Sequence, residues 1–167
     1  GSDALGDAAL LASLGAWLEP LLVDITRFDA IPAGGLFQAL ETQLGWEEGQ
    51  RIAAAAPPRF TTPAGTTHAI DYSAEAGPTV EARVQAFYGL SVHPTVGRPP
   101  VPLVLSLTSP AGRPVQTTRD LPAFWTGSWA DVAKDMRGRY PRHHWPDDPA
   151  NATASLKTKR AQARTGR

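Results

Sequence analysis

The chain of 167 residues contains no cysteine and a single methionine, Met136. The lack of cysteine excludes disulfides, a thiolate nucleophile, a cysteine-based zinc site and an iron–sulfur cluster, and it fits a cytoplasmic protein. No apolar run approaches the roughly 18 residues that predict a membrane span, and the first residues lack the pattern of a signal peptide. The chain opens on Gly1-Ser2-Asp3 without an initiator methionine, so we expect a piece of a longer protein.

Motifs that hold nucleotides or hydrolyse bonds are also missing. A phosphate-binding P-loop ends in Gly-Lys-Ser/Thr, and none of the three lysines, Lys134, Lys157 and Lys159, lies in that context. Neither Gly-x-Gly-x-x-Gly nor His-Glu-x-x-His occurs, and residues 89–93 lack the second glycine of a nucleophile elbow. We therefore predict that this chain by itself is not an enzyme.

The net charge of zero averages two unlike parts of the chain. Residues 1–110 hold 5 basic and 11 acidic side chains, whereas residues 111–167 hold 11 basic and 5 acidic ones. Most of the C-terminal excess lies in residues 151–167, which contain 5 basic residues and no acid. A surface of this composition attracts polyanions.

Helical periodicity dominates residues 8–56. Apolar residues recur there at spacings of three and four, with Pro20 expected to kink the run or begin a new helix. A second helix is expected after residues 32–35, with Gly45 as its stop, and a third over residues 46–56. The apolar face of the second helix consists of Leu36, Phe37, Leu40 and Leu44.

The period changes to two after residue 57. Alternation predicts strands over residues 66–72, 79–84, 102–108 and 115–118, and the turn formers at 109–112 predict a hairpin between the last two. Residues 85–89 could instead form a helix. The sequence leaves that choice open.

A helical period returns near residue 120. Asp120 is expected to cap a first turn, and Ser128 with Asp131 has the spacing of a capping box for a helix that Gly138 ends. The predicted fold class is therefore α+β, with an N-terminal helical unit and a C-terminal helix packed on the sheet. We expect that sheet to be small and antiparallel, or a partly open barrel, with four or more strands.

Basic and aromatic residues interleave in and beside a proline-rich segment, residues 139–149, which we name the strap. Cations neutralise phosphates and rings stack on unpaired bases, so the pattern predicts nucleic-acid contact. With the tail, the predicted contacts are Arg137, Arg139, Tyr140, Arg142, His143, His144, Trp145, Lys157, Lys159 and Arg160. The competing interpretation is that Tyr140 and Trp145 anchor the strap to the domain and its arginines are merely solvated.

Two further expectations concern the same region. His143, His144, Asp147 and Asp148 could in principle ligate a metal, but adjacent histidines in an extended segment point to opposite sides, so we predict no metal site. Residues 151–167 are basic and nearly free of apolar side chains, so we expect a flexible tail.

Several longer stretches resemble the C-terminal domain of the HrpB family of bacterial ATP-dependent RNA helicases. They are residues 102–116 (PLVLSLTSPAGRPVQ), 118–121 (TRDL), 124–125 (FW), 134–141 (KDMRGRYP), 144–149 (HWPDDP) and, more weakly, 83–89 (RVQAFYG). The resemblance implies an HrpB-type domain over residues 57–150, preceded by a helical lead-in over 1–56 and followed by the tail over 151–167.

The resemblance also implies a DEAH/RHA-type, superfamily 2 helicase whose ATPase motor lies upstream. ATP and Mg²⁺ would be cofactors of the full-length helicase, with none bound by this segment. The expected role is that of a non-catalytic accessory domain that helps hold single-stranded RNA beside the motor. The alternative is a protein-docking module that binds a partner protein or the helicase core without touching RNA.

Overall fold

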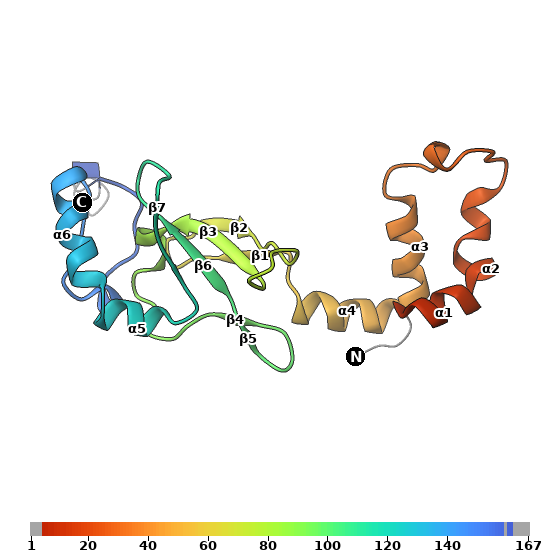
Figure 1. Ribbon diagram of the computed structural model, residues 1–167, viewed down its shortest axis with the longest axis horizontal. Coiled ribbons are helices and arrows are strands. Elements are labelled where there is room, and N and C mark those ends of the chain that lie inside the picture. Colours follow the sequence, from red (N-terminus) through yellow and green to blue (C-terminus); the bar gives the residue numbers. More distant parts are fainter. Residues whose placement is uncertain (1–4, 159, 162–167) are drawn as a thin grey trace. The chain divides into compact units, whose positions relative to one another are not determined.

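A computed structural model describes residues 5–158 and 160–161 and divides the chain into two compact units, Gly1–Ala55 and Ala56–Arg167 (Figure 1). The first unit is helical and the second contains all the described strands. The α+β class predicted from the sequence is confirmed. Within residues 5–158 and 160–161, no helix is long and apolar enough to cross a membrane.

The helices of the first unit follow the predicted pattern. Pro20 lies in the first turn of a short 3-10 helix, where a missing N–H costs nothing. Gly45 ends the longer helix with a positive φ of 73°, which a residue without Cβ adopts freely. The elements are α1 (Asp7–Ala12), α2 (Leu14–Trp17), η2 (Glu19–Leu22), η3 (Phe28–Ala30), α3 (Gly35–Leu44) and α4 (Trp46–Ala55).

The second unit contains seven short strands among its described residues. They form three separate sheets, β1–β2, β3–β6–β7 and β4–β5, rather than one barrel. The predicted strand over residues 66–72 is shorter than expected, and its partner β1 was not predicted. The strands are β1 (Arg59–Thr61), β2 (Thr67–Ala69), β3 (Thr79–Arg83), β4 (Thr95–Val96), β5 (Val101–Pro102), β6 (Val104–Thr108) and β7 (Pro114–Thr118).

The central sheet is mixed, which corrects the prediction of an antiparallel one. β6 and β7 form the expected antiparallel hairpin, but β3 runs parallel to β6 with Val80 opposite Leu105. A parallel pair needs a crossover of a dozen or more residues. The segment between β3 and β6 provides it, because it contains the 3-10 helix η4 (Val84–Phe87) and the β4–β5 pair. The choice left open for residues 85–89 is thus settled in favour of a helical turn.

Two helices and a last helical turn complete the second unit, namely α5 (Leu121–Thr126), α6 (Trp129–Arg139) and η5 (Pro149–Asn151). The Asp120 carboxylate accepts the amide of Ala123 at 3.0 Å, which confirms the predicted cap of α5. The capping box predicted at Ser128 is wrong: its backbone is near-helical, and its side chain makes no cap hydrogen bond. Gly138 does not end α6 either, since the amide of Tyr140 still bonds to the carbonyl of Met136 at 2.7 Å.

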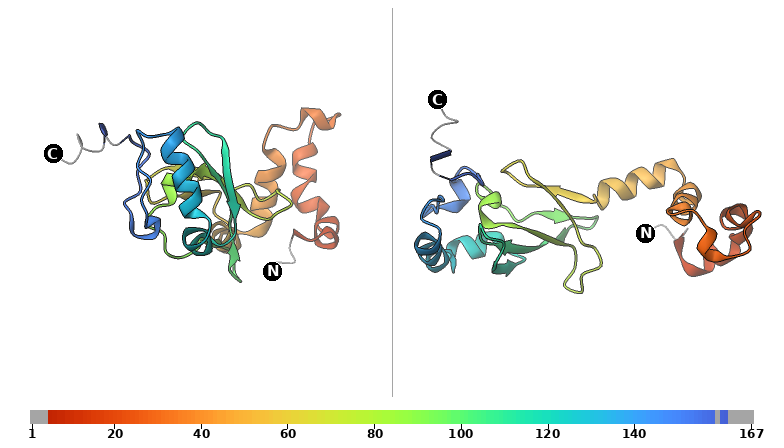
Figure 2. Two further views of the ribbon diagram at one scale, coloured as in Figure 1. Left: turned by 60° about the vertical axis from the view of Figure 1, so that its left-hand side comes forward. Right: turned by 90° about the horizontal axis from the view of Figure 1, so that it is seen from above.

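The hydrophobic core belongs to the second unit. Its 17 buried members run from Ile70 to Trp145. Trp129 lies within 5.3–6.3 Å of four other rings, those of Tyr88, Phe124, Trp125 and Trp145. Figures 1 and 2 show α5 and α6 together at one side of the central sheet, where they supply these rings. The predicted packing of the C-terminal helix on the sheet is confirmed.

Candidate nucleic-acid interface

The strap is anchored to the core by its largest side chain. Trp145 is 4% exposed, and its indole N–H donates to the carbonyl of Tyr140 at 3.0 Å. Its ring lies 6.3 Å from that of Trp129 and 6.5 Å from that of Tyr140. A ring buried in this way has no open face for a nucleic-acid base. The stacking role predicted for Trp145 does not fit its position.

Arg137 also serves the interior of the domain. Its guanidinium donates to the carbonyl of Trp145 at 3.2 and 2.8 Å and pairs with Asp147. Two buried side chains hold the strap from the other side, because Gln85 and Tyr88 donate to the carbonyl of His144 at 3.3 and 3.4 Å. These bonds satisfy strap carbonyls that would otherwise lose their contact with water. We interpret Arg137 as an anchor of the strap.

Tyr140 and Arg139 occupy intermediate positions. The Tyr140 hydroxyl lies 3.3 Å from that of Ser109, and its ring is half-buried against the core. Arg139 pairs with Asp135 at 3.0 Å on the surface of α6, and the arginine side chain is 62% exposed. A surface pair of this kind contributes little to stability and exchanges readily for another anion. Arg139 therefore remains a candidate phosphate contact, whereas Tyr140 is mainly structural.

Exposed cations remain at the outer edge of the strap. Arg142 and His144 are exposed, and neither forms a salt bridge with another residue in the part of the chain that the structure describes. His143 lies between them and is half-buried. Burial, and then the nearby Arg83 guanidinium, lower the pKa of His143 below its usual range, so its ring is neutral at pH 7.

Arg83 is a site residue that sequence reasoning missed. It is the exposed last residue of β3, 60 positions before His143, and only the packing of the strap against the sheet brings the two together. No local signal could have indicated this, because β3 reads as an ordinary half-buried strand. The Oε1 atom of Gln85 and the Nδ1 atom of His143 are buried there without a hydrogen-bond partner among the described residues.

The described part of the tail begins against the domain. Ala152, Ala154 and Leu156 are half-buried and pack on the core, so residues 151–156 are not the loose segment that we predicted. Their alternate spacing lets one side of an extended strand-like segment cover apolar surface. Lys157 and Arg160 follow at exposed positions. Lys159, the remaining predicted contact, lies outside the described residues.

The candidate metal ligands are engaged elsewhere. Asp147 pairs with Arg137, and Asp148 accepts the side-chain amide of Asn151 at 2.7 Å. Across residues 5–158 and 160–161, no three histidine or acidic side chains come together in a way that could hold a metal ion.

The family of the chain follows from comparison with known proteins. A family model described as "ATP-dependent helicase C-terminal", HrpB_C, matches residues 17–149. The chain belongs to this HrpB_C family. The HrpB_C match begins within α2, well before the range 57–150 predicted from the sequence, and therefore includes most of the helical unit.

The HrpB_C relatives are much longer than this chain. The ATP-dependent RNA helicase HrpB of Escherichia coli (strain K12) is 41% identical over 157 residues, which are 94% of this chain and 19% of that protein. A crystal structure titled as the E. coli DExH-box NTPase HrpB matches with a TM-score of 0.81 at 41% identity, over 92% of this chain and 19% of that one. A second, titled as the E. coli DEAH/RHA helicase HrpB, matches with a TM-score of 0.65 at 38% identity, over 84% of this chain and 18% of that one.

Proposed function

We propose that this chain is the non-catalytic, C-terminal accessory domain of an ATP-dependent RNA helicase and that its second unit binds single-stranded RNA. The observation that carries the proposal is the charge of the two units. Residues 1–55 hold 2 basic and 8 acidic side chains, and residues 56–167 hold 14 basic and 8 acidic ones. The division by structure thus concentrates the positive charge in the unit that carries the strap and the tail.

The geometry favours contact with phosphates over contact with bases. Trp145 is buried and Tyr140 half-buried, so the rings that would stack on bases serve the core instead. The exposed cations Arg139, Arg142, Lys157 and Arg160 remain, together with His144. Contacts of this kind position a nucleic acid but carry no sequence information. We therefore expect binding that depends strongly on salt and weakly on base sequence.

The motor of the helicase lies outside this chain in the proposal. The chain has no Gly-Lys-Ser/Thr phosphate loop, so its residues do not fit ATP and Mg²⁺. Those cofactors, and the hydrolysis they support, are assigned to an upstream DEAH/RHA-type ATPase core of the same polypeptide. The proposal includes a cytoplasmic location, as expected from the composition.

A titration of fluorescently labelled single-stranded RNA, followed by anisotropy at two salt concentrations, tests this function. Replacing Arg139 and Arg142 together by Ala should weaken binding about tenfold and flatten the salt dependence by roughly 0.7 per lost phosphate contact. Arg27→Ala is the matched control, because it removes an exposed, ion-paired arginine from the acidic unit. We expect it to leave binding unchanged.

Absence of salt-dependent binding, or equal binding by the double variant and the control, contradicts RNA contact by the strap. That outcome favours the alternative, a protein-docking module without RNA contact. A pull-down with and without nuclease separates the two functions, since an RNA-bridged association disappears with nuclease and a direct one persists.

A further inference from the structure

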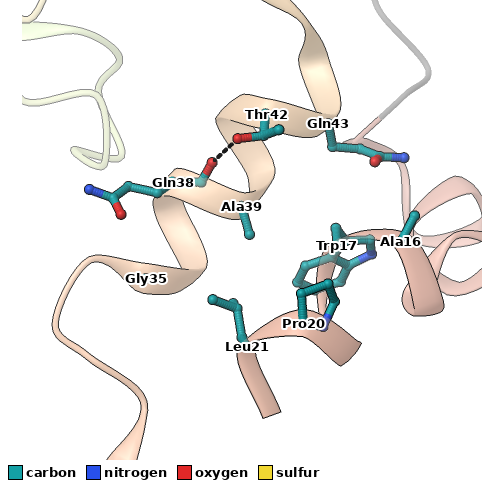
Figure 3. Close-up of a pocket in the computed structure, with 9 residues that line it drawn as sticks. All are labelled: Ala16, Trp17, Pro20, Leu21, Gly35, Gln38, Ala39, Thr42 and Gln43. Carbon is teal, nitrogen blue, oxygen red and sulfur yellow. Dashed lines mark hydrogen bonds between the residues drawn. The ribbon is translucent and has the colours of Figure 1, made fainter. Parts of the chain in front are cut away.

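The helix α3 has two unlike faces. The side toward α2 and η2 is small and polar, and it lines a groove of about 350 Å³ (Figure 3). Its residues there are Gly35, Gln38, Ala39, Thr42 and Gln43. The large apolar residues Leu36, Phe37, Leu40 and Leu44 lie on the other side of the helix, and we name them the α3 stripe.

This arrangement inverts the usual order of an amphipathic helix. Such a helix normally turns its apolar stripe toward the core and its polar side toward water. In α3 the polar side faces the rest of its own unit, while Phe37 in the stripe is 65% exposed and Leu36 is 44% exposed. Trp46, at the start of α4, is 77% exposed. Exposed apolar surface of this extent marks an interaction site.

The first unit also lacks a core of its own. Among its described residues, 5–55, Gly35 alone is buried. Fixing the backbone of each residue costs about 1–2 kcal/mol in conformational entropy, which burial of apolar side chains must offset. The unit does not supply that burial from within. A covering surface must therefore stabilise it.

We propose that the α3 stripe docks on the preceding helicase body of the same polypeptide, against an apolar surface with basic residues at its rim. The stripe supplies the apolar contact, and the excess of acidic residues in this unit attracts the basic rim. The inference rests on the part of the proposed function that places this chain in a longer polypeptide, and it is independent of RNA binding.

The second unit of this chain offers little for the stripe to bind. Its described large apolar side chains are almost all inside its own core, and those left exposed are Tyr72, Val92 and Val101. They come from three different connecting or edge segments, so they do not form a helix-sized apolar face.

A second copy of the chain is also a poor occupant. Two first units, each with 8 acidic and 2 basic side chains, would repel one another when brought face to face. By contrast, this chain spans 19% of the length of the E. coli relative, so most of such a protein lies outside the segment and is large enough to cover the stripe.

Site-specific photo-crosslinking in the full-length helicase polypeptide tests the proposal. A p-benzoylphenylalanine that replaces Phe37 keeps an aromatic ring in the stripe, and mass spectrometry identifies the peptide that it captures. We expect capture of residues upstream of this segment. The same group in place of Gln38, on the groove side of α3, is the matched control and should capture residues of α2 or η2.

Other results at position 37 overturn the proposal. Capture of residues 56–167 assigns the stripe to the second unit, capture of another copy assigns it to a dimer, and no capture leaves it facing solvent. Hydrogen exchange gives an independent measure. The amides of α3 should exchange at least about tenfold more slowly in the full-length polypeptide than in this chain, while those of α6 stay unchanged. Equal rates for α3 contradict docking. RNA binding can persist or fail in either case, so the two proposals fail separately.

Discussion

His93 joins two distant segments of the second unit through both of its ring nitrogens. Its Nδ1 atom accepts the amide of Leu121 at 3.0 Å, and its Nε2 atom lies 2.8 Å from the carbonyl of Leu103. A carbonyl can only accept, so the proton is on Nε2 and the ring is neutral. The side chain thereby fixes the start of α5 against the strand that leads into β6.

Replacing His93 by Ala should therefore lower the free energy of unfolding by about 1–3 kcal/mol, because two partly buried backbone groups lose their partner. Urea denaturation measures this loss. His68→Ala is the control, since the His68 ring bonds only the hydroxyl of Thr66, two residues away on the same hairpin. A similar loss in both variants would show that His93 has no special role as a link.

Tyr88 should make the stability of the protein fall at high pH. Burial raises the pKa of its hydroxyl well above the ordinary value of 10.0, and Arg137 only partly opposes this effect. The unfolded chain loses the proton near pH 10 while the folded chain keeps it, so stability is complete below that pH and declines above it.

The decline should be steeper in the wild type than in Tyr88→Phe, by up to about 1.4 kcal/mol per pH unit above pH 10. Denaturation at pH 8 to 11 measures the difference. Tyr72→Phe is a comparison, because burial raises the pKa of Tyr72 as well, but that ring is exposed and its removal should matter less. Parallel curves for the wild type and Tyr88→Phe would contradict the expectation.

At the scale of elements, α5 and α6 begin in different ways. The side chain of Asp120 caps α5, whereas Ser128 precedes α6 without a cap hydrogen bond. Asp120→Ala should lower the free energy of unfolding by about 1 kcal/mol, and Ser128→Ala should change it by much less. Thermal or urea unfolding of both variants checks this. An equal loss would mean that Ser128 caps α6 in solution as the sequence pattern predicts.

The strap is an element whose structure depends on contacts from three sides. Arg137 comes from α6, Gln85 and Tyr88 from the segment after β3, and Trp145 from the strap itself. The residues that the sequence predicts as an RNA interface are thereby divided between anchors and exposed cations. The competing interpretation, in which Tyr140 and Trp145 hold the strap, describes the anchors, and the RNA proposal now depends on the cations.

At the scale of the whole molecule, stability should belong to the second unit. All 17 residues of the core cluster lie between Ile70 and Trp145, and the first unit adds none of them. Residues 56–167 expressed alone should therefore unfold cooperatively, with the same urea midpoint as the full chain. Near-UV circular dichroism of the tryptophan cluster reports this transition. Loss of that signal in the shorter protein would contradict the expectation.

Local patterns were sufficient for much of the fold. The helices around Pro20 and Gly45, the cap at Asp120 and the β6–β7 hairpin all depend on residues within a few positions of one another. The parallel pairing of β3 with β6 was not predictable in this way, because its crossover spans 20 residues and alternation carries no information on strand direction. Gly138 failed as a stop signal since α6 continues to the anchored Tyr140.

The site divides along the same line. Composition alone places a basic surplus in the C-terminal part of the chain, and the motif spacing alone rules out an ATP-binding loop here, because charge and motifs are properties of the chain itself. The tertiary structure decided that Trp145 is buried, that Arg83 lies beside His143 and that the α3 stripe faces away from its own unit. These outcomes depend on which surfaces meet across long separations in sequence, and that is determined by packing rather than by local propensity.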